Sequence, residues 1–378
     1  MALSVGVPRE TAAGERLVAQ VPEVVSRLVK KGMEVRVESG AGEASFHPDA
    51  EYEAAGAKIV DRAGAFSADV VLKVQPPDEE EIGLLHEGSI LIGFLRPLDH
   101  PEIAEKLAAR GVTALSMELV PRISRAQTMD ALSALSSIGG YKAVIIAAEM
   151  LPKFLPLLTT AAGTVRPANV LVLGAGVAGL QAIATAKRLG ARVSGYDIRE
   201  AVREEVQSLG ATFVELEIEM QEDKDSGGYA KALAAEKAKQ QTKLLVPFIA
   251  RSDIVVTTAL IPGRRAPILI TEEAVRAMQP GSVIIDMAAV SGGNCELTKP
   301  GETAEVNRVQ IVGPLNLPST MPVHASQLYS RTLLAMVNEF VGEDGFNFDF
   351  EDEIFKSACV THNGEVVNER VKGLLAAS

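Results

Sequence analysis

The sequence predicts an α/β protein built from two doubly wound, Rossmann-like parallel-sheet domains, one inserted in the other and joined to it by long helices. Short apolar runs alternate with helix-like stretches from the amino terminus onward, and a second series of this kind begins near residue 168. The chain has 378 residues, which exceeds the size at which a single core stops growing, so two domains are expected.

The first series covers the amino-terminal third of the chain. Its short apolar runs are typical of strands, and the segments between them have helical periodicity. We expect strands at 3–7, 34–37, 68–74, 89–94 and 112–116, and helices at 22–31 and 101–110. A long helical pattern over 126–154 then leads toward the second series as a connector.

The second series has the same alternation. We expect strands at 168–173, 192–196, 212–216, 253–259, 282–287 and 309–313, a helix at 180–189, and a second connecting helix at 324–341. The tail over 360–367, with His362 and Gly364 between apolar positions, predicts a hairpin that returns to the first domain. The first domain is therefore expected to combine 1–127 with 323–378, and the inserted domain to be 128–322.

A glycine pattern follows the first strand of the inserted domain. The run ending at Leu173 passes directly into GxGxxG and then into a helix. In this pattern Gly174 permits the tight turn, Gly176 lets backbone amides approach a pyrophosphate, and Gly179 lets the helix pack closely. The helix start offers amides and a partial positive charge to phosphates. The predicted dinucleotide contacts are Gly174, Ala175, Gly176, Val177, Ala178 and Gly179. An ordinary strand-to-helix turn is the alternative.

An acidic residue at the end of the next strand supports the dinucleotide interpretation. Asp197 follows the glycines by about twenty residues, where a carboxylate can bond a ribose 2'-hydroxyl. An ionised Asp197 also repels a 2'-phosphate, which favours NAD(H) over NADP(H) as the cofactor of this chain. Ile198 is the adjacent predicted contact. Arg199 could accept a 2'-phosphate, but a solvated arginine in the next helix is the favoured interpretation.

Composition excludes several other classes of protein. The net charge of -12 disfavours nucleic acid and anionic membrane surfaces as partners. The two cysteines, Cys295 and Cys359, form no CxxC pair, so neither a disulfide framework nor a metal site is indicated and a reducing cytoplasm is expected.

No membrane span or signal peptide is expected. The amino terminus lacks a charged leader before a long apolar segment. The longest apolar region, 143–160, is interrupted by Glu149, Pro152, Lys153 and Pro156, which makes it poor as a span.

A polar segment over 215–229 has two possible interpretations. It carries six acidic residues and then Gly227, Gly228 and Tyr229. One interpretation is a solvated surface loop without a task. The other is a lid, with the glycine pair as its hinge and Tyr229 covering a bound cofactor.

Several longer motifs resemble one family. The segment 117–130, MELVPRISRAQTMD, resembles the NAD(H)-binding component, domain I of the alpha subunit, of proton-translocating NAD(P) transhydrogenase. The resemblance extends over nearly the whole chain. It also includes TTAAGTV at 159–165, GVAGLQAIATAKRLGA at 176–191, GGYA at 227–230 and TTALIPG at 257–263.

The resemblance implies roles for particular residues. Arg122, Gln127, Asp130 and Ser133 would contact the nicotinamide or its ribose, and Tyr229 would lie on a mobile loop. Arg122 and Gln127 could donate to the carboxamide oxygen, while Asp130 or Ser133 accepts from its nitrogen. From spacing alone, a structural ion pair between Arg122 and Asp130 is the alternative. Further cofactor contacts are implied at Thr258, Ala259 and Leu260.

The resemblance also implies partners. Hydride passes directly between two nicotinamides in this family, so the protein contributes orientation and no acid or base. NADP(H) belongs to a separate subunit and the proton path to a transmembrane subunit, and the sequence shows neither a second GxGxxG nor a span. The chain is thus expected to be a cytoplasmic homodimer, held at the inner face of the cell membrane through these partners.

Two alternatives remain open. The amino-terminal motifs resemble those of alanine dehydrogenase as well, in which Arg16 and Lys73 would hold a substrate carboxylate. That reaction requires an acid–base pair. The histidine is absent around Arg96, Val290 occupies the expected aspartate position, and His100 is interpreted as part of a helix-start turn. The second alternative is an NAD-dependent regulatory or binding module.

Overall fold

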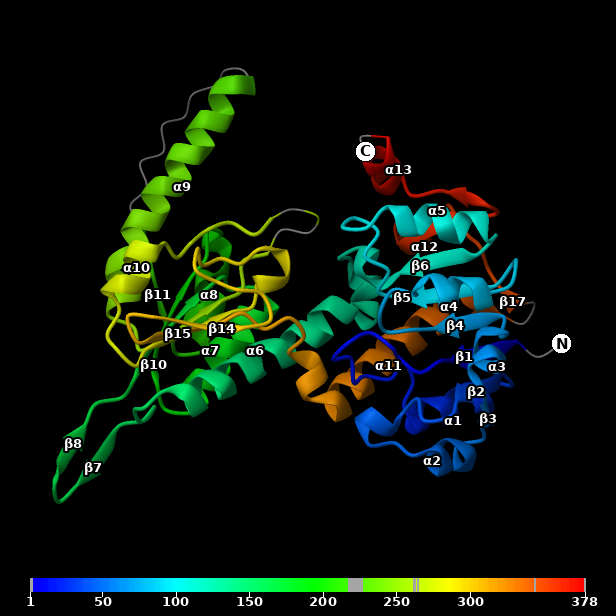
Figure 1. The fold of residues 1–378 in the computed structure, drawn as a ribbon, viewed down its shortest axis with the longest axis horizontal. Coiled ribbons are helices and arrows are strands. Elements are labelled where there is room, and N and C mark those ends of the chain that lie inside the picture. Colours follow the sequence, from blue (N-terminus) through cyan, green and yellow to red (C-terminus); the bar gives the residue numbers. More distant parts are fainter. Residues whose placement is uncertain (1–2, 217–226, 261–262, 264, 343–344, 377–378) are drawn as a thin grey trace. The chain divides into compact units, whose positions relative to one another are not determined.

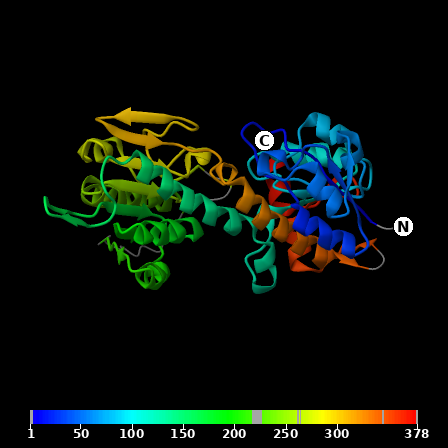
Figure 2. The ribbon, with the colours of Figure 1, turned by 90° about the horizontal axis from the view of Figure 1, so that it is seen from below.

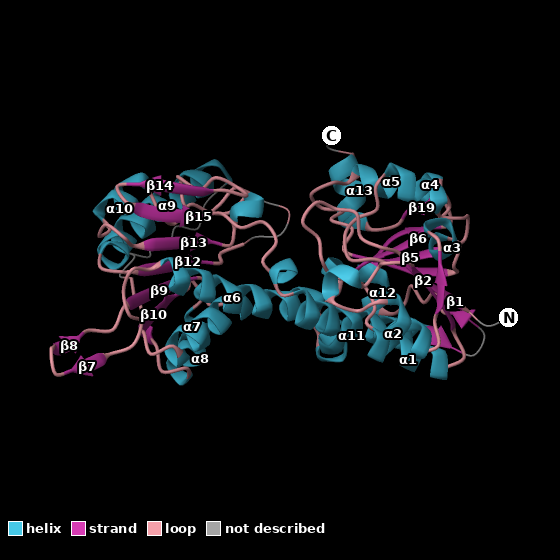
Figure 3. Ribbon diagram, turned by 60° about the horizontal axis from the view of Figure 1, so that its bottom comes forward, coloured by secondary structure: helices cyan, strands magenta, loops and turns pink. Residues whose placement is uncertain are grey.

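The chain forms two compact α/β units. The computed structural model describes residues 3–216, 227–260, 263, 265–342 and 345–376, with the backbone alone over 227–237. The first unit consists of Met1–Leu135 and Pro318–Ser378, and the second of Ser136–Leu317. Each is built on one mostly parallel sheet with helices on its faces (Figure 1 and Figure 3), which confirms the predicted fold class. The structural divisions fall after Leu135 and Leu317, whereas the sequence interpretation placed them after residues 127 and 322.

The first unit contains an eight-stranded sheet in the order β19-β18-β6-β5-β4-β1-β2-β3. Its strands are β1 (Ser4–Val7), β2 (Glu34–Glu38), β3 (Lys58–Val60), β4 (Val70–Leu72), β5 (Ile90–Gly93), β6 (Thr113–Ser116), β18 (Cys359–His362) and β19 (Glu365–Val366). The first six are parallel, and β18 pairs antiparallel with β6 and with β19. The predicted return of the tail to the first sheet is confirmed.

Helices cover both faces of this sheet. They are α1 (Pro22–Lys30), α2 (Asp49–Ala54), α3 (Arg62–Phe66), α4 (Glu79–Leu84), α5 (Glu102–Ala109), α11 (Pro322–Phe340), α12 (Glu353–Ala358) and α13 (Glu369–Leu375); a short hairpin of β16 (Val341–Gly342) and β17 (Gly345–Phe346) follows α11. Leu91 and Ala114 project from the strands into a core with Ile82 of α4 and Leu107 of α5. Burial of these apolar surfaces is the main stabilising contribution to the unit.

The second unit contains a seven-stranded sheet in the order β11-β10-β9-β12-β13-β15-β14. Its strands are β9 (Asn169–Leu173), β10 (Arg192–Tyr196), β11 (Thr212–Phe213), β12 (Ile254–Thr257), β13 (Val283–Asp286), β14 (Thr303–Val306) and β15 (Val309–Val312). All pairs are parallel except β14 with β15, which lie at one side of the sheet, in yellow-orange in Figure 2. The helices are α6 (Ala131–Met150), α7 (Val177–Arg188), α8 (Arg203–Ser208), α9 (Gly227–Ala250) and α10 (Glu272–Ala277).

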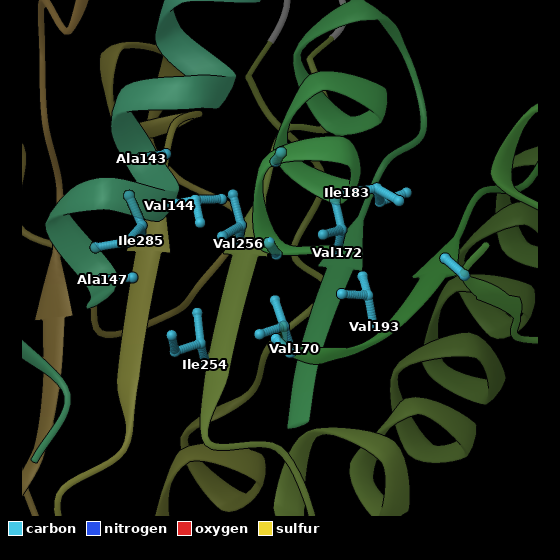
Figure 4. Close-up of a cluster of buried hydrophobic side chains, with 14 of the residues drawn as sticks. Ala143, Val144, Ala147, Val170, Val172, Ile183, Val193, Ile254, Val256 and Ile285 are labelled. Atoms are coloured by element: carbon cyan, nitrogen blue, oxygen red, sulfur yellow. The ribbon is translucent and has the colours of Figure 1, made fainter. Parts of the chain in front are cut away.

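Alternate residues of the central strands of this sheet face opposite cores. Val170 and Val172 of β9 pack with Ala143 and Val144 of α6 and with Ile183 of α7 (Figure 4). Leu171 and Leu173 belong to the core that contains residues of α9 and α10. Because side chains alternate along a strand, a continuous apolar run is needed to fill both cores, as the sequence of β9 provides.

Helix α6 is long and apolar enough to cross a membrane by length and composition, with a mean hydropathy of 1.4. The sequence interpretation placed the longest apolar region over 143–160 and expected no span. In the structure Ala143, Val144 and Ala147 are fully buried against the second sheet, which accounts for the apolar composition of the second half of the helix. Gly140 packs so closely that a β-carbon there would lie 2.0 Å from the carbonyl oxygen of Ala178.

Among the differences from the sequence expectations, three concern the segments 124–150, 158–165 and 227–250. The helix expected over 126–154 is a 3₁₀ helix (Ser124–Met129) followed by α6, because Asp130 interrupts the two and Pro152 lies beyond the end. The hairpin of β7 (Leu158–Thr160) and β8 (Gly163–Val165), which projects from the second unit in Figure 1, was not expected. Residues Gly227 and Gly228 open α9, which extends to Ala250, rather than ending a loop. The alanine- and lysine-rich sequence after Tyr229 favours this helix.

Candidate functional site

The strand order of the second sheet reverses between β9 and β12. The chain leaves β9 toward β10 on one side and later returns to β12 on the other, so the strand order reverses at this point. Ligands of open α/β sheets bind outside the carboxyl ends of the strands at such a switch point. The glycine pattern lies here, between the end of β9 and the start of α7.

The three glycines of the turn differ in the space around them: a β-carbon would clash at Gly174 and Gly179 but not at Gly176. Gly174 has φ of +98°, and a β-carbon there would lie 2.6 Å from the hydroxyl oxygen of Thr258. A β-carbon on Gly179 would lie 1.8 Å from the carbonyl oxygen of Gly174, so only glycine lets α7 begin this close to the turn. A β-carbon on Gly176 would meet no atom within 4 Å. The open space at Gly176 lies at the start of α7, where a ligand can approach the backbone.

The start of α7 is suited to an anion. Gly176 is its N-cap and has no side chain to satisfy the first amides, and no acidic residue lies in the first turn. Free amides and the helix dipole favour a phosphate group at such a position. Val177, at the first helical position, has 43% of its surface exposed, while Ala175 is buried and Ala178 is half-buried.

Asp197 lies at the end of β10 beside this turn. Its Oδ2 accepts a hydrogen bond of 2.8 Å from the backbone amide of Ala175, which connects it to the glycine turn. Arg199 donates to both carboxylate oxygens through Nε and Nη2, each at 2.9 Å. Burial alone would raise the pKa of Asp197, but the hydrogen bonds from Arg199 and Ala175 lower it below its usual value.

Arg199 is exposed at the start of the next helical turn, as interpreted, but its pairing with Asp197 was not predicted. Its side chain is 57% exposed, yet it is bonded to Asp197, whose side chain is only 7% exposed. The pairing was not visible in the sequence because spacing alone does not show which way a guanidinium turns. The neighbouring Ile198 is 78% exposed at the same edge of the sheet.

The end of β12 forms the other side of the switch point. The hydroxyl of Thr258 donates to the carbonyl oxygen of Gly174 at 3.0 Å, and its amide donates to Leu173 at 2.9 Å. Ala259 is half-buried and Leu260 has 49% of its surface exposed. The structure thus brings the predicted contacts on this side next to the glycine turn.

Two buried polar residues next to β12 were missed in the sequence. Asp286, at the end of β13, is fully buried and accepts five hydrogen bonds. The donors are the hydroxyls of Thr257 and Thr298 and the amides of Ala288, Asn294 and Cys295. Asn294, also fully buried, bonds both backbone groups of Ala259. The glycine pair before Asn294 was the available signal, because it indicates a tight return of the chain.

The predicted nicotinamide contacts lie in the first unit, on the 3₁₀ helix Ser124–Met129 and its flanks. The side chains of Arg122 and Gln127 are exposed, and within the described residues neither bonds to another group. Asp130 accepts from the backbone amide of Ser133 at 2.8 Å and from its hydroxyl at 2.6 Å. The alternative ion pair between Arg122 and Asp130 is not formed in this part of the chain.

Arg125 anchors this segment within the first unit. It donates to Glu339 of α11 at 2.9 Å and also bonds to Asp352. Asp352 in turn caps α12 by accepting from the amides of Ile354 and Phe355. Arg122 and Gln127 are therefore presented by a backbone that is tied to two helices.

Tyr229 is the predicted cofactor contact on the polar segment. Its side chain lies outside the described residues, although its backbone belongs to the first turn of α9. The acidic residues over 217–226, which formed most of the predicted lid, also lie outside them.

The residues expected to serve an alanine dehydrogenase have different surroundings in the structure. Lys73 is buried, and its Nζ lies 2.9 Å from Glu81 and 3.3 Å from Glu10. Arg16 is exposed. His100 is exposed in the turn before α5, as predicted, and its Nδ1 lies 3.3 Å from Oε1 of Glu102, the first residue of that helix. Val290 is 54% exposed. In the described part of the chain, no three His, Cys, Asp or Glu side chains are grouped as metal ligands.

Comparisons with known families agree with this geometry. Residues 6–139 match the family described as "Alanine dehydrogenase/PNT, N-terminal domain", and residues 143–369 match "Alanine dehydrogenase/PNT, C-terminal domain". The chain belongs to the alanine dehydrogenase/PNT family. These two matches together cover most of the chain, including the glycine turn and the 117–130 motif.

Within this family, the chain is more similar in sequence to transhydrogenase relatives than to alanine dehydrogenases. It is 46% identical to the first polypeptide of the NAD(P) transhydrogenase alpha subunit of Rhodospirillum rubrum, over 98% of this chain and 99% of the relative. It is 30% identical to alanine dehydrogenase of Bacillus subtilis, over 97% and 93%. The crystal structure of transhydrogenase from Sinorhizobium meliloti superposes with a TM-score of 0.88 at 43% identity, covering 96% of this chain and 100% of that one. An L-alanine dehydrogenase structure gives 0.82 at 26% identity, covering 99% of both chains. The predicted resemblance is confirmed, and alanine dehydrogenase is the more distant relative.

Proposed function

We propose that this chain is the NAD(H)-binding subunit of an NAD(P) transhydrogenase, and that it presents NADH for direct hydride transfer to NADP+ on a partner subunit. The observation that carries the proposal is the glycine turn at the switch point, with Asp197 beside it, in a chain that is 46% identical to a transhydrogenase alpha-subunit polypeptide over nearly its full length. Oxidation of NADH and reduction of NADP+ balance, since one hydride leaves C4 of the first and joins C4 of the second.

The described geometry supports a bound orientation for NAD(H). The free amides at the start of α7 suit the pyrophosphate. Asp197, on the β10 side, suits the adenosine ribose, and its charge disfavours the 2'-phosphate of NADP(H). The nicotinamide half then extends to the opposite side of β9, toward Thr258, Ala259 and Leu260 at the end of β12.

The second sheet offers no accessible acid or base next to this position among the described residues. Asp286 is the carboxylate at the end of β13, but it is fully buried and both its oxygens are already occupied by donors. An amino acid dehydrogenase needs proton transfer at its substrate, whereas hydride exchange between nicotinamides does not. The protein contributes by holding and aiming the ring.

Arg122, Gln127, Asp130 and Ser133 are proposed to aim the nicotinamide through its carboxamide. The side chains of Arg122 and Gln127, which bond to no other described group, are available to donate to the carboxamide oxygen. Asp130, already fixed by Ser133, keeps lone pairs that can accept from the carboxamide nitrogen.

The same function requires partners. We propose an NADP(H)-binding subunit and a transmembrane proton-channel subunit, which would hold this chain at the inner, cytoplasmic face of the cell membrane and couple hydride transfer to proton translocation. A homodimer is also proposed. Its support is the β7–β8 hairpin region, where Leu157 is 60% exposed and Val165 is 45% exposed, since paired copies would cover such apolar surface.

Reconstitution with an NADP(H)-binding transhydrogenase subunit tests the proposal. With NADH on this chain and NADP+ on the partner, hydride exchange should appear only when both proteins are present. Oxidation of alanine with NAD+ by this chain alone would refute the proposal and favour the alanine dehydrogenase alternative. NADH binding with no exchange alongside a competent partner would favour a regulatory binding module.

A further inference from the structure

Asn294 holds the end of β12 through its side-chain amide. Its Oδ1 accepts from the backbone amide of Ala259 at 3.1 Å, and its Nδ2 donates to the carbonyl oxygen of Ala259 at 2.9 Å. The second Nδ2 proton is donated to the carbonyl oxygen of Pro267 at 2.7 Å. One side chain therefore bonds both backbone groups of a single residue, as a neighbouring strand would, at a position where β13 has already ended.

The backbone around Asn294 is built to send this side chain inward. Gly292 and Gly293 have φ of +94° and +83°, a region that other residues rarely adopt. A β-carbon on Gly293 would lie 2.8 Å from Oδ2 of Asp286. The same carboxylate oxygen accepts the backbone amide of Asn294 at 2.8 Å. Asp286 thus fixes the backbone of Asn294, and Asn294 fixes Ala259.

The residue held in this way lies between two groups of the proposed cofactor site. Thr258 precedes Ala259 and bonds to Gly174 of the glycine turn, and the exposed Leu260 follows it. Since Asp197 marks the adenosine side of the switch point, Ala259 and Leu260 border the nicotinamide side. Asn294 is fully buried, so its own side chain is not exposed at this edge of the sheet.

We infer that Asn294 is a positioning residue for the nicotinamide half of the cofactor, acting through Ala259 and Leu260. The inference rests on the proposed NAD(H) site, and it identifies the side chain that fixes Ala259 and Leu260 on the nicotinamide side of that site. Without the amide, the backbone groups of the half-buried Ala259 and the carbonyl of Pro267 lose these partners, so this segment would move to regain hydrogen bonds. The glycine turn and Asp197 have their own bonds and would stay in place.

The test compares two ligands on the Asn294→Ala variant. NADH reports on both halves of the site, whereas ADP occupies only the adenosine and pyrophosphate positions. We expect the Kd for NADH to rise about tenfold and the Kd for ADP to stay within about twofold of its wild-type value. Hydride exchange at saturating NADH should fall about a hundredfold, because a small misplacement of the ring costs this much. Equal weakening of both ligands, or no change in either, would overturn the inference.

Asn169→Ala is the matched control. Asn169 also donates from its side chain to a backbone carbonyl, that of Arg251 at 3.3 Å, but it lies at the amino end of β9, the opposite edge of the same sheet. This variant should leave both Kd values and the exchange rate unchanged. A loss of NADH affinity here would show that general destabilisation of the sheet, and not the clamp on Ala259, determines the result.

A second variant keeps the inference testable if Asn294→Ala does not fold. Leu260→Ala alters an exposed side chain and should weaken NADH without weakening ADP. Unchanged NADH affinity in Leu260→Ala would contradict the placement of the nicotinamide half. Failure of the wild-type chain to bind NADH would instead refute the proposed function itself, so the two failures are distinguishable.

Discussion

The guanidinium of Arg199 lies against the carboxylate of Asp197, with Nε 2.9 Å from Oδ1 and Nη2 2.9 Å from Oδ2. The backbone amides of Arg199 and Ala175 donate to the same carboxylate. The group proposed to recognise the adenosine ribose is therefore oriented before any ligand arrives. Its partner is a cation that could itself receive a 2'-phosphate if the carboxylate were removed.

Asp197→Ala should weaken NADH binding and reduce the discrimination against NADPH. The variant loses the acceptor for the ribose hydroxyl and leaves Arg199 unpaired. A hydrogen bond to a charged group contributes about 1.5–3 kcal/mol, so the Kd for NADH should rise about tenfold to a hundredfold. Fluorescence titration with NADH and NADPH measures both effects, and circular dichroism checks folding. An unchanged NADH affinity would reject the ribose role of Asp197.

Arg199→Ala should shift the pH dependence of NADH binding. The hydrogen bonds from Arg199 keep the pKa of Asp197 below its usual value of about 4, so the ionised acceptor persists as the pH falls toward that value. Without them, burial raises the pKa, and the loss of affinity on acidification begins at higher pH. Titrations of NADH at a series of pH values measure this shift. Coincident profiles for the variant and the wild type would contradict the assigned role of Arg199.

The pair of Asp197 and Arg199 should also make the free energy of unfolding depend on pH in a predictable direction. A lowered carboxyl pKa in the folded state stabilises the protein above the unfolded pKa, and this stabilisation is lost as the pH falls through the folded pKa. The difference in stability between Arg199→Ala and the wild type should therefore be present at neutral pH and disappear in acid. Urea unfolding at both pH values checks it.

Alanine substitutions at Gly176 and Gly179 should have opposite consequences. In Gly179→Ala the new β-carbon meets the carbonyl oxygen of Gly174, so α7 must move and stability should fall by about 1–3 kcal/mol or more. In Gly176→Ala the methyl group points into open space, so the fold should be retained while NADH affinity falls about tenfold. Thermal unfolding and NADH titration separate the two cases. A stable Gly179→Ala that binds normally would contradict the described turn.

Arg122→Ala should slow hydride exchange more than it weakens NADH binding. The side chain makes no bond within the described residues, so its removal should not disturb the fold. Loss of an aiming contact on the carboxamide should reduce the exchange rate about a hundredfold. Single-turnover exchange at saturating NADH is the measurement, and Arg125→Ala, which loosens the segment that carries Arg122, serves for comparison. Equal losses of affinity and rate in Arg122→Ala would indicate a simple binding residue.

Gln20→Met should raise the stability of the first unit. Within the described residues, neither side-chain polar atom of the fully buried Gln20 has a hydrogen-bond partner. A buried unpaired polar group costs about 1–3 kcal/mol, which an apolar side chain of similar length avoids. The Tm should increase by about 2 °C or more. Gln181→Met is the control, because Gln181 has a partner in Thr185 and should show no such gain. A decrease in Tm for Gln20→Met would show that its amide is satisfied in solution.

Much of the fold and half of the candidate site could be predicted from local sequence. The buried run of β9, the glycine turn and Asp197 are consecutive or regularly spaced, and their roles depend on backbone conformation that the residue type itself limits. The return of the tail to the first sheet was predicted correctly for a similar reason, since a glycine turn between apolar positions predicts a hairpin.

The rest depends on contacts between distant residues. The glycine pair before Asn294 indicates a tight return of the chain, but it does not indicate that the side chains of Asp286 and Asn294 are both fully buried. Their burial becomes favourable only because five donors meet Asp286 and because backbone groups of Ala259 and Pro267 meet the side chain of Asn294. In the same way, the orientation of Arg199 toward Asp197 and the pairing of Lys73 with Glu10 and Glu81 follow from side-chain geometry that spacing does not specify.

The pairing of β18 with β6 bears on how the polypeptide folds during synthesis. Strand β6 ends at Ser116, and its neighbour β18 begins only at Cys359, after the entire second unit. The ribosome thus releases all of the inserted sheet before the segment that completes the first one. Until β18 is synthesised, the β6 edge of the nascent amino-terminal sheet has unpaired backbone groups, which can promote aggregation. Translation that stops after Leu317 would leave a complete second unit attached to a first-unit sheet that lacks its last two strands, β18 and β19.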